Sequence, residues 1–225
     1  MSHKKGPSCI KIIPAILTNS VEDLRDKLRQ IQGAVDWAQI DLMDGKFVNN
    51  TSISLKDLSR IKTKLNLEAH LMVLRPEKLF SDCQKAKIKR VIFHFEAVNN
   101  LDEILRTAEK YNFQIGVALN PETSVSKIKP FLNNNLDEGA LSVCYILLLS
   151  VHPGFSSQKF IPPVLKKIKD LKKISPQIKI GVDGGINQEN IKKVAAAGAD
   201  YLMAGSAVFK NGEVRSNIKK LQSAI

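Results

Sequence analysis

The stretch "VDWAQIDLMDGKFV", from Val35 to Val48, decides the fold. Its first half is mostly apolar, which predicts a buried β-strand over residues 37–43. The strand ends in two aspartates, Asp41 and Asp44, which stand three residues apart. A buried strand that ends in carboxylates is typical of a parallel barrel, because the chemistry of such barrels lies at the carboxyl ends of the strands.

Strand-like and helix-like segments alternate along the whole 225-residue chain. Apolar runs predict eight strands, at Ile10–Leu17, Trp37–Met43, Leu67–Val73, Arg90–Glu96, Gln114–Leu119, Cys144–Ser150, Lys179–Val182 and Tyr201–Ala204. Amphipathic segments between them predict eight helices. A GxGxxG motif does not follow the first strand, so we favour a single-domain α/β fold, a (β/α)8 TIM barrel over residues 1–225, over an open doubly wound sheet.

Several helix ends can be placed from the residues that favour them. Ser20 is expected to cap the first helix, and Pro76 to lie in the first turn of the third. Asn187 is expected to cap a helix that stops at Gly198. The last helix is expected over residues 214–224.

The composition excludes several classes of protein. No run of 18 or more apolar residues occurs, so we expect no membrane span and no membrane partner. The N-terminus lacks the apolar core of a secretory signal, and residues 1–8 are expected to be a frayed lead-in. Three cysteines without CxxC spacing predict reduced thiols and a cytoplasmic location. The segment "LNNNLDEGALS", residues 132–142, is expected to be a polar loop.

The formal net charge of +12 could steer an anionic ligand or a nucleic acid. In "VLKKIKDLKKIS", residues 164–175, apolar residues recur at helical spacing and lysines fall between them. That pattern predicts an amphipathic helix with a solvated basic face. Interleaved aromatic residues and known binding motifs are missing, so no nucleic-acid partner is expected.

Polar residues gather where the predicted strands end. Asp41 and Asp183 end two different strands, so we expect them to face each other and to share acid and base work. His70 ends a third strand and is interpreted as a metal ligand or a general acid. Asp44 is expected to organise the loop that follows its strand. The remaining histidines, His3, His94 and His152, are expected to be structural.

Three glycine-containing loops end the last three strands: "HPGFSSQKF" at 152–160, "VDGGI" at 182–186 and "AGSAVF" at 204–209. Glycines let a backbone approach a phosphate closely, and backbone N–H groups at a helix start can bind it. The loops after the last barrel strands commonly do so. The sequence therefore predicts a phosphorylated small ligand; ordinary tight turns are the alternative.

The motifs "DLMDGKFV", "AHLM", "LNPET", "VHPGFSSQKFIP", "VDGGIN" and "AGADYLMAGSAVF" together resemble the ribulose-phosphate 3-epimerase family, in order and spacing, from Ile12 to about Phe209. The resemblance implies interconversion of D-ribulose 5-phosphate and D-xylulose 5-phosphate through a 2,3-enediolate. It implies Asp41 and Asp183 as the catalytic acid and base. It also implies one divalent metal ion (Zn, Fe, Mn, Co or Mg) on Asp41, His70, Asp183 and the position of Gln39.

The same resemblance implies a phosphosugar substrate, participation in the pentose phosphate pathway and a homo-oligomer. The substrate-binding residues that it implies are Met43, Met72, Gly154, Phe155, Ser156, Ser157, Gly184, Gly185, Gly205 and Ser206.

Some positions depart from the family pattern. Gln39 stands where the family has a metal-binding histidine, and its amide oxygen is a poorer ligand for zinc, iron or cobalt than imidazole. Ala15 replaces a serine, Leu149 a capping methionine and Asn49 a proline. Two alternatives stay open: an epimerase for a related ketose phosphate such as a ketohexose 6-phosphate, and a catalytically impaired paralogue that binds phosphosugar.

Overall fold

The computed structural model describes residues 10–132, 143 and 145–225. The predicted lead-in and nearly all of the predicted polar loop lie outside the described residues. So do Cys9, Cys144 and His3. The third cysteine, Cys83, is a buried free thiol.

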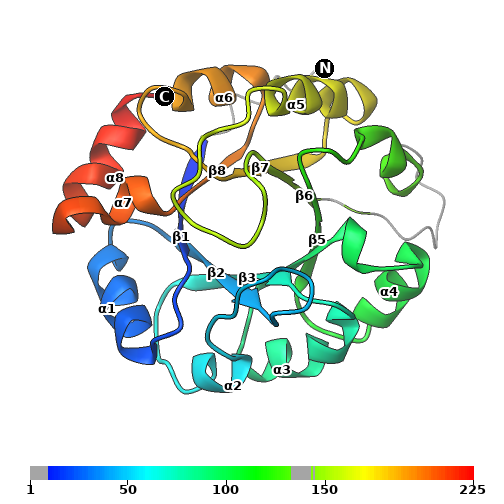
Figure 1. Ribbon diagram of the computed structural model, residues 1–225, viewed down its shortest axis with the longest axis horizontal. Coiled ribbons are helices and arrows are strands. Elements are labelled where there is room, and N and C mark those ends of the chain that lie inside the picture. The colour runs from blue at the N-terminus through cyan, green and yellow to red at the C-terminus, as the bar shows by residue number, and fades with distance from the viewer. Residues whose placement is uncertain (1–9, 133–142, 144) are drawn as a thin grey trace, which may run out of the picture.

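Eight parallel strands close into a barrel, as the sequence predicted (Figure 1). Each strand pairs with its neighbours in chain order, and β1 pairs with β8 to close the ring. The strands are β1 (Lys11–Ile16), β2 (Trp37–Met43), β3 (Asn66–Met72), β4 (Arg90–His94), β5 (Gln114–Leu119), β6 (Tyr145–Leu149), β7 (Lys179–Asp183) and β8 (Tyr201–Ala204).

Helices surround the barrel on the outside (Figure 1). The α-helices are α1 (Val21–Ile31), α2 (Leu55–Leu58), α3 (Phe80–Lys85), α4 (Leu101–Ala108), α5 (Val164–Ile174), α6 (Ile191–Ala197), α7 (Ser206–Phe209) and α8 (Val214–Ser223). Short 3₁₀ helices are η1 (Pro76–Leu79), η2 (Phe95–Ala97), η3 (Val125–Lys127), η4 (Lys129–Phe131) and η5 (Lys210–Gly212). In the part of the chain that the structure describes, no helix is both long and apolar enough to cross a membrane.

Most predicted helix ends are confirmed. Ser20 caps α1 by accepting the N–H of Asp23, Pro76 opens η1, and Gly198 ends α6. The prediction that Asn187 caps α6 is wrong, because that helix begins at Ile191. The Asn187 side chain instead accepts the backbone N–H groups of Glu189 and Asn190, in the turn that leads into α6, as asparagine readily does in loops.

Two other details differ from the prediction. Among the described residues, the connection from β5 to β6 contains the 3₁₀ helices η3 and η4 in place of a longer α-helix. Glu96, expected at the end of a strand, lies in η2. The basic helix is confirmed as α5, whose buried apolar residues are Val164, Ile168 and Leu171.

The inside of the barrel is a core of its own, separate from the larger core under the helices. Its buried apolar members are Ile13, Ala15, Ile92, Ala118, Tyr145, Leu147, Leu149 and Met203. Alternate residues of each strand point into this space. In β2 and β3 the register pairs Gln39 with Glu68 and Asp41 with His70, so these polar residues enter the barrel side by side.

Candidate active site

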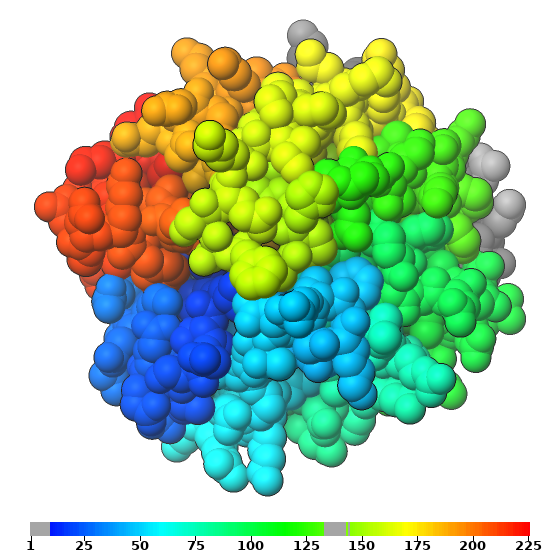
Figure 2. Space-filling model, in the orientation of Figure 1, coloured from blue at the N-terminus to red at the C-terminus, as the bar shows by residue number. Residues whose placement is uncertain are grey.

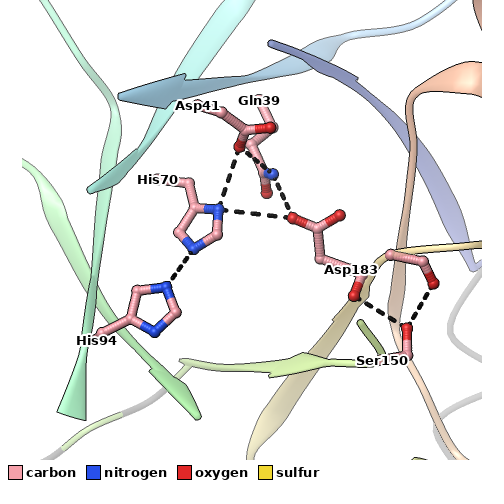
Figure 3. A network of polar contacts seen from close by, with 7 residues as sticks. Gln39, Asp41, His70, His94, Ser150 and Asp183 are labelled. Atoms are coloured by element: carbon pink, nitrogen blue, oxygen red, sulfur yellow. Dashed lines mark hydrogen bonds and ion pairs between the residues drawn. The ribbon is translucent and has the colours of Figure 1, made fainter. Parts of the chain in front are cut away.

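Three side chains meet at the carboxyl end of the barrel: Asp41 from β2, His70 from β3 and Asp183 from β7 (Figure 3). The Nδ1 atom of His70 lies 3.1 Å from Asp41 Oδ1 and 3.5 Å from Asp183 Oδ2. His70 is 1% exposed, whereas the carboxylates keep 13% and 14% of their side-chain surface exposed. A small molecule in the barrel mouth can therefore reach the two carboxylates.

Gln39 holds the two carboxylates together from below. Its Nε2 atom donates to Asp41 Oδ1 at 2.8 Å and to Asp183 Oδ2 at 2.6 Å (Figure 3). The side chain is fully buried, and its Oε1 atom has no hydrogen-bond partner. An uncharged amide therefore bridges the two aspartates by hydrogen bonds, at the position where the family resemblance implied a histidine.

The site could hold a metal ion. Asp41, His70 and Asp183 each offer one ligand atom, and these atoms lie within 4.8 Å of one another. Two carboxylates and an imidazole are a donor set that suits divalent cations. The amide nitrogen of Gln39 cannot ligate, but a half-turn of the amide would exchange its two atoms and direct the unpartnered Oε1 towards the carboxylates. The residues present therefore fit such an ion.

The site holds two carboxyl groups and one imidazole, and their proximity shifts the pKa values of Asp183 and His70. Burial raises the pKa of Asp183, and the negative charge of Asp41 raises it further. Burial alone would lower the pKa of His70, but its hydrogen bond to Asp41 and the nearby carboxylate charges raise it instead. Asp183 thus has an unusual tendency to hold a proton, which suits a general acid.

His94, which was expected to be structural, lies in direct contact with this group. Its Nε2 atom is 2.9 Å from Nε2 of His70, and the rings stack at 5.0 Å (Figure 3). The ring of Phe47 covers His94 at 4.8 Å. Burial lowers the pKa of His94 to about 4, so the ring is neutral at physiological pH. The position of His94 at the end of β4 was the only signal in the sequence.

Ser150 fixes the backbone that carries Asp183, a role that no motif in the sequence predicted. Its hydroxyl lies 2.9 Å from the carbonyl of Asp183 and 2.6 Å from that of Gly184, and donates to them (Figure 3). Its backbone N–H also donates to the Asp183 carbonyl, at 2.7 Å. The turn after β7 is therefore tied to the end of β6.

Asp44 does what the sequence predicted. Its Oδ1 atom accepts the backbone N–H groups of Lys46 and Phe47, and its Oδ2 atom accepts that of Leu74. Burial alone would raise the pKa of this carboxyl, but these three bonds lower it. Asp44 thus organises the loop after β2 and joins it to the loop after β3.

A cavity of about 360 Å³ lies above the three-residue group. Figure 2 shows the segment after β6, in yellow-green, over the centre of this face. Besides Asp41, His70 and Asp183, the cavity is lined by all ten predicted substrate-binding residues: Met43, Met72, Gly154, Phe155, Ser156, Ser157, Gly184, Gly185, Gly205 and Ser206. Ala15 and Leu149, two of the departures from the family pattern, line it as well.

The two glycines after β7 cannot be exchanged for larger residues. A Cβ on Gly184 would lie 2.3 Å from Val151 Cγ2, and one on Gly185 would lie 2.8 Å from the backbone nitrogen of Phe160. Both have positive φ, at 111° and 65°. The backbone here is left bare beside the cavity, which lets a ligand approach its N–H groups.

Two lysines in the cavity wall were not predicted from the sequence. Lys27 from α1 and Lys210 from η5 both line the cavity, together with Gly205 and Ser206. Lys27 bonds to Asp23 at 2.7 Å and lies 5.5 Å from the centroid of the Phe209 ring. Positive charge at this end favours an anionic ligand group.

Comparison with known proteins gives a consistent picture. The model of the "Ribulose-phosphate 3 epimerase family" matches residues 11–209. The chain is 34% identical over 223 residues to the ribulose-phosphate 3-epimerase of Bacillus subtilis, covering 96% of this chain and 99% of that protein. It is 33% identical over 217 residues to the cytoplasmic isoform from Oryza sativa subsp. japonica, covering 93% of each. The enzyme of Chlamydia muridarum is 36% identical over 222 residues, covering 94% of this chain and 93% of that protein.

Solved structures share the fold at lower sequence identity. A crystal structure of 3-hexulose-6-phosphate synthase matches with a TM-score of 0.70 and 19% identity, covering 96% of this chain and 100% of that chain. A tryptophan synthase α-subunit from Pyrococcus furiosus matches with a TM-score of 0.71 and 12% identity, covering 94% and 97%. At these identities the likeness shows the barrel architecture alone.

Proposed function

The chain belongs to the ribulose-phosphate 3-epimerase family, and we propose that it interconverts D-ribulose 5-phosphate and D-xylulose 5-phosphate. One observation supports this most strongly. Two carboxylates, Asp41 and Asp183, reach the same cavity from different strands and contact the same imidazole. Inversion at a carbon next to a carbonyl needs one group to remove a proton and another to return it to the opposite face.

In this mechanism the two aspartates exchange roles with the direction of the reaction. For one direction, ionised Asp41 removes the proton at C3 of the substrate, and protonated Asp183 delivers a proton to the other face. The raised pKa of Asp183 favours this assignment. The amide of Gln39 keeps both carboxylates in place through its two hydrogen bonds. A divalent ion on Asp41, His70 and Asp183 would supply Lewis-acid stabilisation of the enediolate charge.

The phosphate group of the substrate is assigned to the far end of the cavity. Backbone N–H groups of the loops after β7 and β8, at residues 184–185 and 205–206, would donate to its oxygens. Lys27 and Lys210 add positive charge there. Met43 and Met72, which pack together in a small apolar cluster at the mouth, would cover the reacting carbons.

The metal preference follows from Gln39. An imidazole ligand favours zinc, iron or cobalt, whereas an amide oxygen beside two carboxylates favours magnesium or manganese. We therefore expect activity with manganese or magnesium at least as high as with zinc. The cytoplasmic location and the homo-oligomeric state remain predictions, and light scattering of the purified protein would test the second.

Gln39 and Ala15 also favour a second candidate, a barrel that binds phosphosugar without turnover, because both lie where the family resemblance implied functional side chains. One experiment separates the two. Ribulose 5-phosphate is incubated with the protein in deuterated water, with each of several divalent metals, and deuterium at C3 is followed by NMR. We expect exchange with at least one metal; no exchange with any metal, while the sugar phosphate still binds, would contradict the epimerase. A ketohexose 6-phosphate in parallel tests substrate length.

A further inference from the structure

We propose that His94 is a positioning residue: by accepting a hydrogen bond from Nε2 of His70, it holds a hydrogen on that atom and leaves Nδ1, which faces the two aspartates, as the nitrogen available to a metal ion. The proposal rests on the proposed function, because His70 belongs to the same metal-binding group. His94 does not line the cavity. Its contact with the three-residue group is made through His70.

The contact between the two rings requires a proton in one place. The Nε2 atoms of His70 and His94 are 2.9 Å apart, which is a hydrogen-bond distance. Two bare nitrogens would repel each other there, and two N–H groups would clash. One ring must therefore donate and the other accept, and the direction of this bond sets the tautomer of each neutral ring.

Glu96 decides the direction. Its Oε2 atom lies 3.4 Å from Nδ1 of His94, while its Oε1 atom is held by the N–H of Asn120 at 2.9 Å and by the hydroxyl of Thr123. The carboxylate is thus anchored on one oxygen with the other facing the ring. Among the described residues, Nδ1 of His94 makes no hydrogen bond, but the carboxylate charge beside it favours a hydrogen on that atom, which leaves Nε2 of His94 as the acceptor.

The direction of this hydrogen bond determines the role of Nδ1, the other ring nitrogen of His70. When His70 donates from Nε2, Nδ1 is the ring nitrogen that can bind a metal ion, in exchange for the hydrogen that it shares with Asp41 in the metal-free protein. That atom lies 3.1 Å from Asp41 and 3.5 Å from Asp183, inside the group that could hold a metal. A histidine ligates metal only through an unprotonated nitrogen, and the partner of its other nitrogen commonly fixes this choice. In the opposite tautomer, the lone pair of His70 would lie on Nε2 and face His94 in place of the metal position.

A packing role for His94 would look different in experiment. The ring also lies against Phe47 and His70, so any large change could weaken the fold. Three variants separate the roles. His94→Gln carries an amide oxygen to about the place of Nε2, His94→Asn reaches only to about Nδ1, and His94→Leu offers no polar atom.

Metal affinity is measured by titration calorimetry with Mn²⁺ and Co²⁺ alone, without substrate, and the Co²⁺ absorption spectrum reports the ligand set. We expect His94→Leu and His94→Asn to bind about 10- to 100-fold more weakly than the wild type, as is common when such a supporting residue is lost. We expect His94→Gln to recover most of the affinity. Thermal unfolding in the presence of a chelator checks that the variants fold.

Nitrogen-15 NMR of the histidine rings tests the tautomers directly in the wild-type protein. The expected result is a proton on Nδ1 of His94 and none on its Nε2. A proton on Nε2 of His94 would overturn the inference, and so would Leu and Asn variants that bind metal as tightly as the wild type. Failure of the wild type to bind any divalent metal would instead count against the proposed metal site, and the NMR result would still decide the direction of the hydrogen bond.

Discussion

The barrel contains two buried polar clusters, one at its base and one at its mouth. Strand β3 contributes to both, with Glu68 at the base and His70 two residues later at the mouth. At the base, Glu68 pairs with Arg90 at 2.9 Å, one carboxylate with one guanidinium. At the mouth, Asp41 and Asp183 share a single imidazole and the amide of Gln39.

At the base, Arg90 packs against aromatic rings in addition to its ion pair with Glu68. The guanidinium of Arg90 lies over three aromatic rings, at 4.7 Å from Trp37, 4.1 Å from Tyr145 and 4.9 Å from Tyr201. The mouth instead opens into the cavity and keeps an excess of negative charge. The difference teaches that charge balance separates the two clusters: the base pairs one carboxylate with one guanidinium, although Glu68 Oε1 has no hydrogen-bond partner in the part of the chain that the structure describes, whereas the mouth has two carboxylates and is completed by a cation or a proton.

The largest effect is expected at the mouth. Asp183→Asn removes a proton donor and acceptor, so turnover should fall by about 10³-fold or more. Its stability should stay level or rise, because one of two neighbouring buried negative charges is gone. Steady-state kinetics and urea unfolding check both expectations. Asp44→Asn, which keeps an acceptor for the loop, is the matched control and should retain most of the turnover. A large loss of stability in Asp183→Asn would break the comparison.

The next effect belongs to the base. Arg90→Met leaves Glu68 buried without its counter-ion, which should lower the free energy of unfolding by about 3–5 kcal/mol. The double variant Glu68→Leu/Arg90→Met should recover much of this loss, because no buried charge remains unpaired. Urea unfolding of the single and double variants measures the coupling. If Arg90→Met proves as stable as the wild type, the base is not held by its ion pair.

The pH dependence of stability distinguishes the clusters further. Burial raises the pKa of Glu68 from 4.5 to about 7, although Arg90 lowers it. A raised folded-state pKa means that this stabilisation is present below pH 4.5 and is lost as the pH rises through about 7. Relative to Glu68→Gln, the wild type should lose about 2–3 kcal/mol between about pH 5 and 8, at about 1.4 kcal/mol per pKa unit. Parallel curves for the two proteins would show that Glu68 titrates normally.

The smallest expected effect sharpens the role of Gln39. Gln39→His replaces an amide donor with an imidazole that can ligate, so Zn²⁺ or Co²⁺ affinity should rise by about tenfold. Calorimetry with each metal measures this, and Gln39→Leu is the control that removes both hydrogen bonds to the aspartates. Unchanged affinity in Gln39→His would place Gln39 outside the metal position.

Much of the fold followed from local patterns. The eight strands and their order were predicted because burial on both faces leaves unbroken apolar runs, which any short window of sequence reveals. The strand ends then located Asp41, His70 and Asp183, since every strand of a parallel barrel ends at the same rim. Local signals failed at Asn187, where a turn competed with the helix for the same side chain.

The partners across the barrel were decided only by the tertiary structure. Gln39 and Asp183 are 144 residues apart in sequence, and their contact depends on how the closed ring brings β2 and β7 to face each other. The same holds for the pairing of His70 with His94 and for the aromatic rings around Arg90. The sequence by itself determined which residues of a strand share a face, because side chains alternate along each strand. Which of them touch depends on strand tilt, register and closure, and these are properties of the assembled barrel.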